Sequence, residues 1–402
     1  MVIISRITSR KRKHNMNHLR NIILVTILLL LPVFLSGCWD RKEINDVAIV
    51  LTSAIDIEED GTYRVTVLIP LARQLAGSTK GGSSDGKAYY LDSESAPTIT
   101  EATFKLQKKM ARHMSLTHRR IIVIGEQLAR EGIDFIFDHI PRWYENRLST
   151  LLVISEGTGA DFLQASPKLE RFPSEASREL VRAMDVFSVD IRQVGIQLSY
   201  DSDPIIPFLL KKQTTIGNDT SEEVSVGGYA QFHKGKMVDV FRDDEAHGLL
   251  WLLKKPRSYE MSFSDDTHKL LSFYVQSGHI QITPSSQSGQ LSFHVLVNVH
   301  AKLREDSSTD DEFHTQRIYD LEQQLADGIN RQITAAIQQM QQKGTDSVQL
   351  GLAVWRKFPA DWKQHYESTW NEIFPKTIIT VHVDARILDT GLIDQDITKE
   401  SP

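Results

Sequence analysis

The chain of 402 residues carries 46 lysines and arginines against 52 aspartates and glutamates, a formal net charge of −6. The first 37 residues hold six of the basic residues and none of the acidic ones, which leaves 40 basic and 52 acidic residues, a net charge of −12, for the rest. An acidic body of this kind is a poor partner for nucleic acid, and charge alone would not draw it to anionic lipid. Cys38 is the only cysteine, so no intrachain disulfide can form and the fold must rest on its core.

Residues 1–37 have the charge and hydropathy pattern of an export signal. The six basic residues lie between Arg6 and Arg20, which favours their retention on the cytoplasmic side of a membrane. The apolar run Ile22–Leu35 is short for a spanning helix of about 20 residues and typical of a cleaved signal. An uncleaved membrane anchor is the alternative, and both Met1 and Met16 are compatible with the start of translation.

Leu35-Ser36-Gly37-Cys38 closes the apolar run and has the form of a lipobox, in which small residues precede a cysteine that receives a diacylglyceryl group. Two acyl chains give stable anchoring, whereas a single chain is marginal and reversible. We therefore predict a lipoprotein signal peptide over residues 1–37 and lipid attachment at Cys38, the first residue of the mature chain. The lipid would hold the chain to the outer face of a cytoplasmic membrane.

Short strands and helices alternate over residues 38–200, which predicts an N-terminal α+β region, possibly of two subdomains. Thr98 and Glu101 have the spacing of a capping box at the start of one helix. The glycine-rich run 77–86 is too polar to pack and is predicted to be an exposed loop. The expected strands are 48–57, 63–69, 119–124 and 150–154, and the expected helices are 98–112, 126–130, 134–144, 160–165 and 174–183.

A domain boundary is predicted at residues 201–223, because Pro204, Pro207 and the polar run 214–223 are typical of a linker. The C-terminal α+β domain then covers residues 224–395. It is expected to begin with a hairpin that turns at Lys234-Gly235, followed by a helix over residues 243–253.

Apolar and polar residues alternate along 291–303 and again along 379–387, which predicts two strands that each bury one face. Between them, an apolar stripe at helical spacing predicts a long helix over residues 317–343 with Gly344 as its C-cap. A further helix is expected after Pro359. The predicted fold class is α+β, with mixed or antiparallel sheets packed against helices in two to three small domains, and the C-terminal sheet is expected to be antiparallel.

Most signatures of catalysis, nucleotide binding and metal binding are absent from the sequence. The weak candidates for metal binding are the acidic run 243–247 and three histidines on polar strand faces, His294, His300 and His382. The aromatic residues Trp362, Tyr366 and Trp370 could form a carbohydrate platform, but their helical spacing is more typical of a core. We predict no catalytic residues, no metal and no cofactor.

The residues after the lipobox carry a specific resemblance. Cys38-Trp39-Asp40-Arg41-Lys42-Glu43-Ile44-Asn45-Asp46-Val47-Ala48-Ile49-Val50 resembles the mature start of the GerC-type spore germination lipoproteins. Later parts of the same family are similar to residues 118–132, Arg142, the triplet Glu145-Asn146-Arg147, residues 228–232, 245–252 and 355–362, Trp370 and the closing strand to Gly391. The resemblance covers essentially all of the mature chain.

The resemblance implies a three-domain α+β fold and a non-catalytic C subunit of a nutrient germinant receptor. Such a subunit would lie on the outer surface of the spore inner membrane, held by lipid at Cys38, together with polytopic A and B subunits. A substrate-binding lipoprotein of a transporter is the alternative, and an exported hydrolase ranks last. The sequence leaves open which nutrient is sensed and whether this subunit contacts it.

Overall fold

The structure is a computed structural model that divides into two compact units, Met1–Val47 and Ala48–Pro402. The 3₁₀ turn η1 (Ile44–Asp46) belongs to the first unit. The predicted signal peptide except its short stretch 21–26, the lipid site Cys38 and the predicted loop 77–86 lie outside the described residues. No helix in the described part of the chain is long and apolar enough to cross a membrane. The structure describes residues 21–26, 43–71, 88–183, 186–255, 258–264, 270–287, 290–307 and 315–390.

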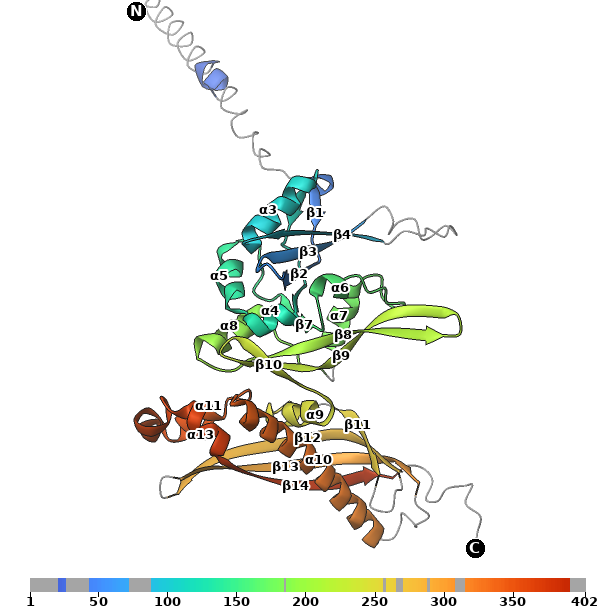
Figure 1. The fold of residues 1–402 in the computed structure, drawn as a ribbon, viewed down its shortest axis with the longest axis vertical. Coiled ribbons are helices and arrows are strands. Elements are labelled where there is room, and N and C mark those ends of the chain that lie inside the picture. The colour runs from blue at the N-terminus through green and yellow to red at the C-terminus, as the bar shows by residue number, and fades with distance from the viewer. Residues whose placement is uncertain are drawn as a thin grey trace, which may run out of the picture. The chain divides into compact units, whose positions relative to one another are not determined.

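The larger unit contains an eight-stranded mixed sheet with the strand order β10-β9-β8-β7-β6-β2-β3-β4 (Figure 1). Its centre is parallel, because β2, β6, β7 and β8 run in one direction, while the outer pairs are antiparallel. The strands are β2 (Thr52–Ile57), β3 (Tyr63–Pro70), β4 (Tyr89–Ala96), β6 (Ile121–Gly125), β7 (Leu151–Ser155), β8 (Ile205–Ile216), β9 (Asp219–His233) and β10 (Lys236–Phe241).

Helices cover both faces of this sheet, as its central strands require. Every residue of β6 and β7 is buried, and alternate residues enter different apolar clusters: Ile122 and Ile124 pack on one face, Ile121 and Val123 on the other. The first face packs on α3 (Ile99–Lys109), α4 (Glu126–Glu131), α5 (Asp134–Arg142) and α8 (Ile191–Ser199), the second on α6 (Gly159–Phe162) and α7 (Pro173–Arg182). A small separate sheet pairs β1 (Val47–Ile49) with β5 (His113–Ser115).

The rest of the chain builds a four-stranded sheet in the order β11-β12-β13-β14. Figure 1 shows the long helix α10 lying across this sheet. The strands are β11 (Tyr259–Ser264), β12 (Leu270–Gln287), β13 (Gln290–Asp306) and β14 (Ile378–Asp389). The helical elements are α9 (Asp243–Leu252), α10 (Thr315–Lys343), α11 (Leu350–Lys357), α12 (Pro359–Asp361), the π-helical turn η3 (Trp362–Tyr366), α13 (Trp370–Ile373) and η4 (Phe374–Lys376).

Several predictions of local structure are confirmed. The Thr98 hydroxyl accepts a hydrogen bond from the Glu101 amide at 3.2 Å and so caps α3. The strand β13 buries alternate side chains, and the stripe along α10 packs in the same apolar cluster. The hairpin between β9 and β10 turns at Lys234-Gly235, where both residues have positive φ. The predicted α+β class is likewise confirmed.

The predicted linker 201–223 is instead mostly strand. Residues 205–216 form β8 and pair with β9 along its whole length, from Ile205 opposite Gln231 to Ile216 opposite Asp219. Figure 1 shows this hairpin extending beyond the helices. The tip of the hairpin has the polar composition of a linker. It nevertheless forms strand, because the backbone hydrogen bonds between β8 and β9 need no apolar side chains.

Two expectations about the C-terminal part are wrong. The strands β13 and β14 pair in parallel, with Val295 opposite Val381, because the chain between them crosses back through α10. The helix expected after Pro359 is broken into α12, η3, α13 and η4. Its aromatic residues nevertheless form core: Tyr366 and Phe374 are buried, and the Trp370 ring lies 5.3 Å from that of Trp362.

Candidate functional site

The residues that the sequence offers as weak candidates for metal binding either form other hydrogen bonds or lie at different positions along the strands. On the β13–β14 ladder, His294 lies opposite Thr380, whereas His382 lies opposite Leu296. In the acidic start of α9, Asp244 accepts a hydrogen bond from Gln332 of α10. No group of three histidine, cysteine, aspartate or glutamate side chains in the described ranges could hold a metal ion.

Two separate segments that resemble the GerC-type family meet at a buried arginine. Arg119 lies two residues before β6, and its guanidinium donates to the Asn146 amide oxygen at 2.7 Å and to the Ser53 hydroxyl at 3.2 Å. Burial lowers the pKa of Arg119 to about 10, so this side chain stays charged at neutral pH. These two hydrogen bonds connect the segment before β6 with the segment after α5 and hold both to β2.

The best-built polar site lies where the eight-stranded sheet meets the four-stranded part of the chain. We call it the junction and define it by Asp203, Gln231, His233, Thr345 and Asp346. The first three belong to the eight-stranded sheet or its immediate lead-in, and the last two follow the C-terminus of α10. Asp203, Gln231 and Thr345 are all buried.

Asp203 links the two sides of the junction directly. Its carboxylate accepts a hydrogen bond from the Asp346 backbone N–H at 2.9 Å. The His233 ring nitrogen Nδ1 lies 3.2 Å from the same carboxylate, and the Lys234 amide donates to it at 3.3 Å. Burial raises the pKa of Asp203 above its ordinary value of 3.8.

The Asp346 side chain organises the chain that follows it. It accepts hydrogen bonds from the backbone amides of Leu350 and Gly351, both at 2.7 Å, and so caps the N-terminus of α11. It also accepts from the Trp370 indole N–H at 3.0 Å, which brings in the aromatic segment. Burial, together with the nearby Asp203, raises the pKa of Asp346 to about 6 despite these three donors.

A second row of hydrogen bonds runs beside the two carboxylates. The Gln231 amide donates to the Thr345 hydroxyl at 2.5 Å and accepts from the Gln339 amide at 3.0 Å. On the surface, Lys343 pairs with Asp239 at 2.8 Å. Buried, fully partnered polar groups specify one arrangement of the elements they join.

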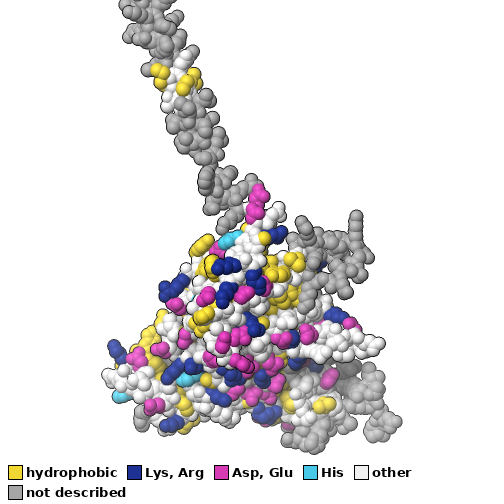
Figure 2. Space-filling model, turned by 45° about the horizontal axis from the view of Figure 1, so that its top comes forward, with side chains coloured by type: hydrophobic (Ala, Val, Ile, Leu, Met, Phe, Trp, Pro, Cys, Tyr) yellow, Lys and Arg dark blue, Asp and Glu magenta, His cyan; other side chains and the backbone are white. Residues whose placement is uncertain are grey.

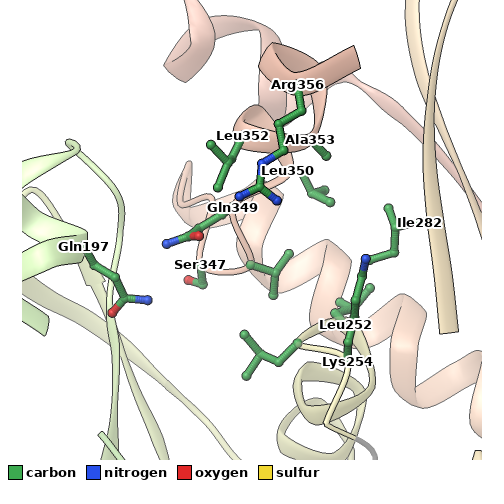
Figure 3. Close-up of a pocket in the computed structure, with 12 residues that line it drawn as sticks. Gln197, Leu252, Lys254, Ile282, Ser347, Gln349, Leu350, Leu352, Ala353 and Arg356 are labelled. Atoms are coloured by element: carbon green, nitrogen blue, oxygen red, sulfur yellow. The ribbon is translucent and has the colours of Figure 1, made fainter. Parts of the chain in front are cut away.

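A cavity of about 260 Å³ adjoins the junction (Figure 3). Gln197 of α8 lines it from the eight-stranded side. The remaining lining comes from the C-terminus of α9, from Ile282 of β12 and from residues 347–356 around the start of α11. Two of its residues, Lys254 and Gln349, have left-handed backbone conformations, with φ of 58° and 60°. Such strained positions concentrate at functional sites.

Comparison with known proteins identifies the family. The model of the spore germination protein N-terminal domain matches residues 40–210, and the model described as spore germination B3/GerAC like, C-terminal, matches residues 227–391. The chain belongs to the GerAC family of spore germination proteins. The resemblance found in the sequence is thereby confirmed.

Two relatives match over nearly their full length. YfkR of Bacillus subtilis (strain 168), whose name places it among spore germination proteins, is 32% identical over 88% of this chain and 92% of its own. Spore germination protein KC of the same organism is 26% identical, over 94% of this chain and 98% of its own. The crystal structure of the GerBC protein aligns with a TM-score of 0.56 at 19% identity, over 84% of this chain and 96% of that one, which supports the fold.

The motifs and periodic patterns of the sequence do not single out the junction. Asp203 lies in the supposed linker, and Asp346 follows a glycine cap, where an aspartate is usually an exposed turn residue. The available indication was the spacing from Asp346 to Leu350, which suits a carboxylate that caps the following helix. Its burial depends on Trp370, 24 residues further along, and no local pattern gives that contact.

The raised pKa of Asp346 makes a testable contribution to stability. The folded chain holds this proton more tightly than the unfolded chain, where the pKa has its ordinary value of 3.8. The contribution is therefore complete below about pH 4 and is lost as the pH rises through about 6, by up to about 3 kcal/mol. We expect Asp346→Asn to abolish this pH dependence, measured as the difference in unfolding free energy between the two proteins from pH 4 to pH 7.

The variant comparison cancels the titrating groups that do not interact with Asp346, because both proteins share them, so the measured difference reports Asp346 together with its coupling to Asp203. Asp384→Asn, an exposed position on β14, is the matched control and should leave the pH profile of the wild-type chain unchanged. A difference between wild type and Asp346→Asn that stays constant from pH 4 to pH 7 would contradict the assignment.

Proposed function

We propose that this GerAC-family chain is the lipid-anchored C subunit of a nutrient germinant receptor, with a non-catalytic role in nutrient-triggered spore germination. The observation that carries the proposal is the match of both family models, which together span residues 40–210 and 227–391. Relatives named as spore germination proteins KC and B3 align over 98% of their own lengths, so the correspondence extends through the whole body of the chain.

The lipobox supports the anchored location. Its Cys38 stands where the mature chain would begin, and a diacylglyceryl group there would place the acidic body on the outer surface of the spore inner membrane. On the face drawn in Figure 2, acidic and basic side chains are interspersed, so that face offers no broad basic patch of the kind nucleic acid requires. The partners we propose are the polytopic A and B subunits of the receptor and the membrane lipid.

The architecture weighs against the alternative of a transporter's substrate-binding lipoprotein. Such modules usually have two doubly wound lobes around an interlobe ligand cleft. Here one sheet has a parallel centre with antiparallel edges, and the other is a four-stranded sheet covered by α10. The chain therefore lacks the pair of similar lobes in the residues that the structure describes.

A clean deletion tests the receptor role. Spores of the deletion strain, challenged with a panel of nutrients, should lose dipicolinate release in response to one nutrient class. Non-nutrient triggers should act normally, because they do not require the receptor. Reintroduction of the intact gene is the control and should restore the response. A response that stays normal to every nutrient, also after removal of sister receptor genes, would contradict the proposal.

The substitution Cys38→Ala tests the anchor separately. Without lipid the subunit is no longer concentrated at the membrane, and the effective concentration that tethering supplies is lost. We expect the protein to leave the membrane fraction and the nutrient response to slow by about tenfold or more. Gly37→Ala keeps a small residue before the cysteine and is the matched control, with normal fractionation. Normal germination with unanchored Cys38→Ala protein would refute the role of the lipid.

A further inference from the structure

The cavity beside the junction combines two cationic side chains with apolar walls. Lys254 and Arg356 both line it, and neither forms an ion pair in the described part of the chain. Among the described residues that line it there is no aspartate or glutamate. The whole chain is acidic, so two exposed cations that have no carboxylate partner among the described residues are a local reversal of its charge. A cavity of this kind attracts an anion.

The cavity also offers a polar group that no protein atom satisfies. The Gln197 side-chain oxygen is buried and has no hydrogen-bond partner in the described structure. Figure 3 shows the Gln197 amide and the Arg356 guanidinium directed toward the same space from opposite parts of the chain. That oxygen is an acceptor, so a carboxylate cannot satisfy it, but the Nε2 of the same amide carries two N–H donors for an anion bound in the cavity.

The walls and the volume limit the ligand. Leu252, Leu350 and Ile282 present aliphatic surface. The lining also contains two further leucines, a valine and an alanine, together with the polar residues Ser347 and Gln349. A volume of about 260 Å³ lies below the range of about 300–1,000 Å³ that is usual for drug-sized ligands, so the ligand must be small. Aliphatic walls with a few convergent polar groups are typical of sites that bind a small amphipathic molecule.

We propose that this cavity binds a small monocarboxylate with an aliphatic body of roughly five to seven carbons. Arg356 binds the carboxylate, since a guanidinium matches a carboxylate in charge and in planar geometry. Lys254 supplies the second positive charge, and the Gln197 side-chain N–H donates a hydrogen bond to the carboxylate from across the junction. The aliphatic body packs on Leu252, Leu350 and Ile282. The ligand thus contacts both sides of the junction.

The same charges discriminate against free amino acids. An α-ammonium group would enter beside two cations, and the described lining offers no carboxylate to pair with it. A neutral amide of the same length would lose the attraction to both cations but fill the same apolar space. The cavity should therefore prefer the simple carboxylate to the amide and to the amino acid of equal chain length.

Calorimetric titration of the full-length chain in detergent micelles with three six-carbon probes tests this preference. Hexanoate, hexanamide and norleucine share the same carbon skeleton and differ in charge. We expect hexanoate to bind at least about tenfold more tightly than either of the others, and to raise the thermal unfolding temperature of the chain. Equal binding of all three probes, or no binding of hexanoate at millimolar concentration, would overturn the proposal.

Variants locate the binding in the cavity. Arg356→Gln and Lys254→Gln should each weaken hexanoate binding by about tenfold or more, because each removes one of the two cations. Lys363→Gln removes an exposed charge of η3 that does not line the cavity, and it should bind hexanoate as the wild type does. Equal losses in all three variants would show general charge attraction and would refute this site. The test reads binding alone, so its outcome is independent of the role in germination.

Discussion

A single buried carboxylate, that of Asp346, is the interaction on which the arrangement of this chain depends. It caps α11 through the amides of Leu350 and Gly351 and holds the aromatic segment through Trp370. Its own backbone N–H donates to the carboxylate of Asp203, at the edge of the eight-stranded sheet. Removal of one partner from such a buried network leaves the others unsatisfied, which is costly in a low-dielectric interior.

The network explains how two sequence modules form one body. The second family model begins at residue 227, within β9, yet β9 and β10 complete the eight-stranded sheet. The first strands of the C-terminal module are therefore built into the sheet of the N-terminal module, and the hydrogen bond from Gln231 to Thr345 continues the connection toward α10. The proposed ligand cavity lies beside this connection and has walls from both sides of it.

Much of the local structure could be predicted from sequence because local physics decides it. The Thr98 cap, the alternation along β13 and the stripe along α10 each follow from the spacing of a few residues. Alternation shows which face of a strand is buried, but it does not give the direction of the neighbouring strand, so the parallel β13–β14 pair was missed. The polar tip of the β8–β9 hairpin and the burial of Asp346 depend on partners far along the chain.

Amide hydrogen exchange on the full-length chain tests the central claim, that the junction holds both parts as one cooperative body. The amides of Asp346, Leu350 and Gly351 should exchange as slowly as those of β9, because their acceptors are buried carboxylates. Asp203→Ala should accelerate exchange around Asp346 and leave β6 unchanged. Rapid exchange of the Asp346 and Gly351 amides in the unaltered chain, or no effect of Asp203→Ala on them, would contradict this account.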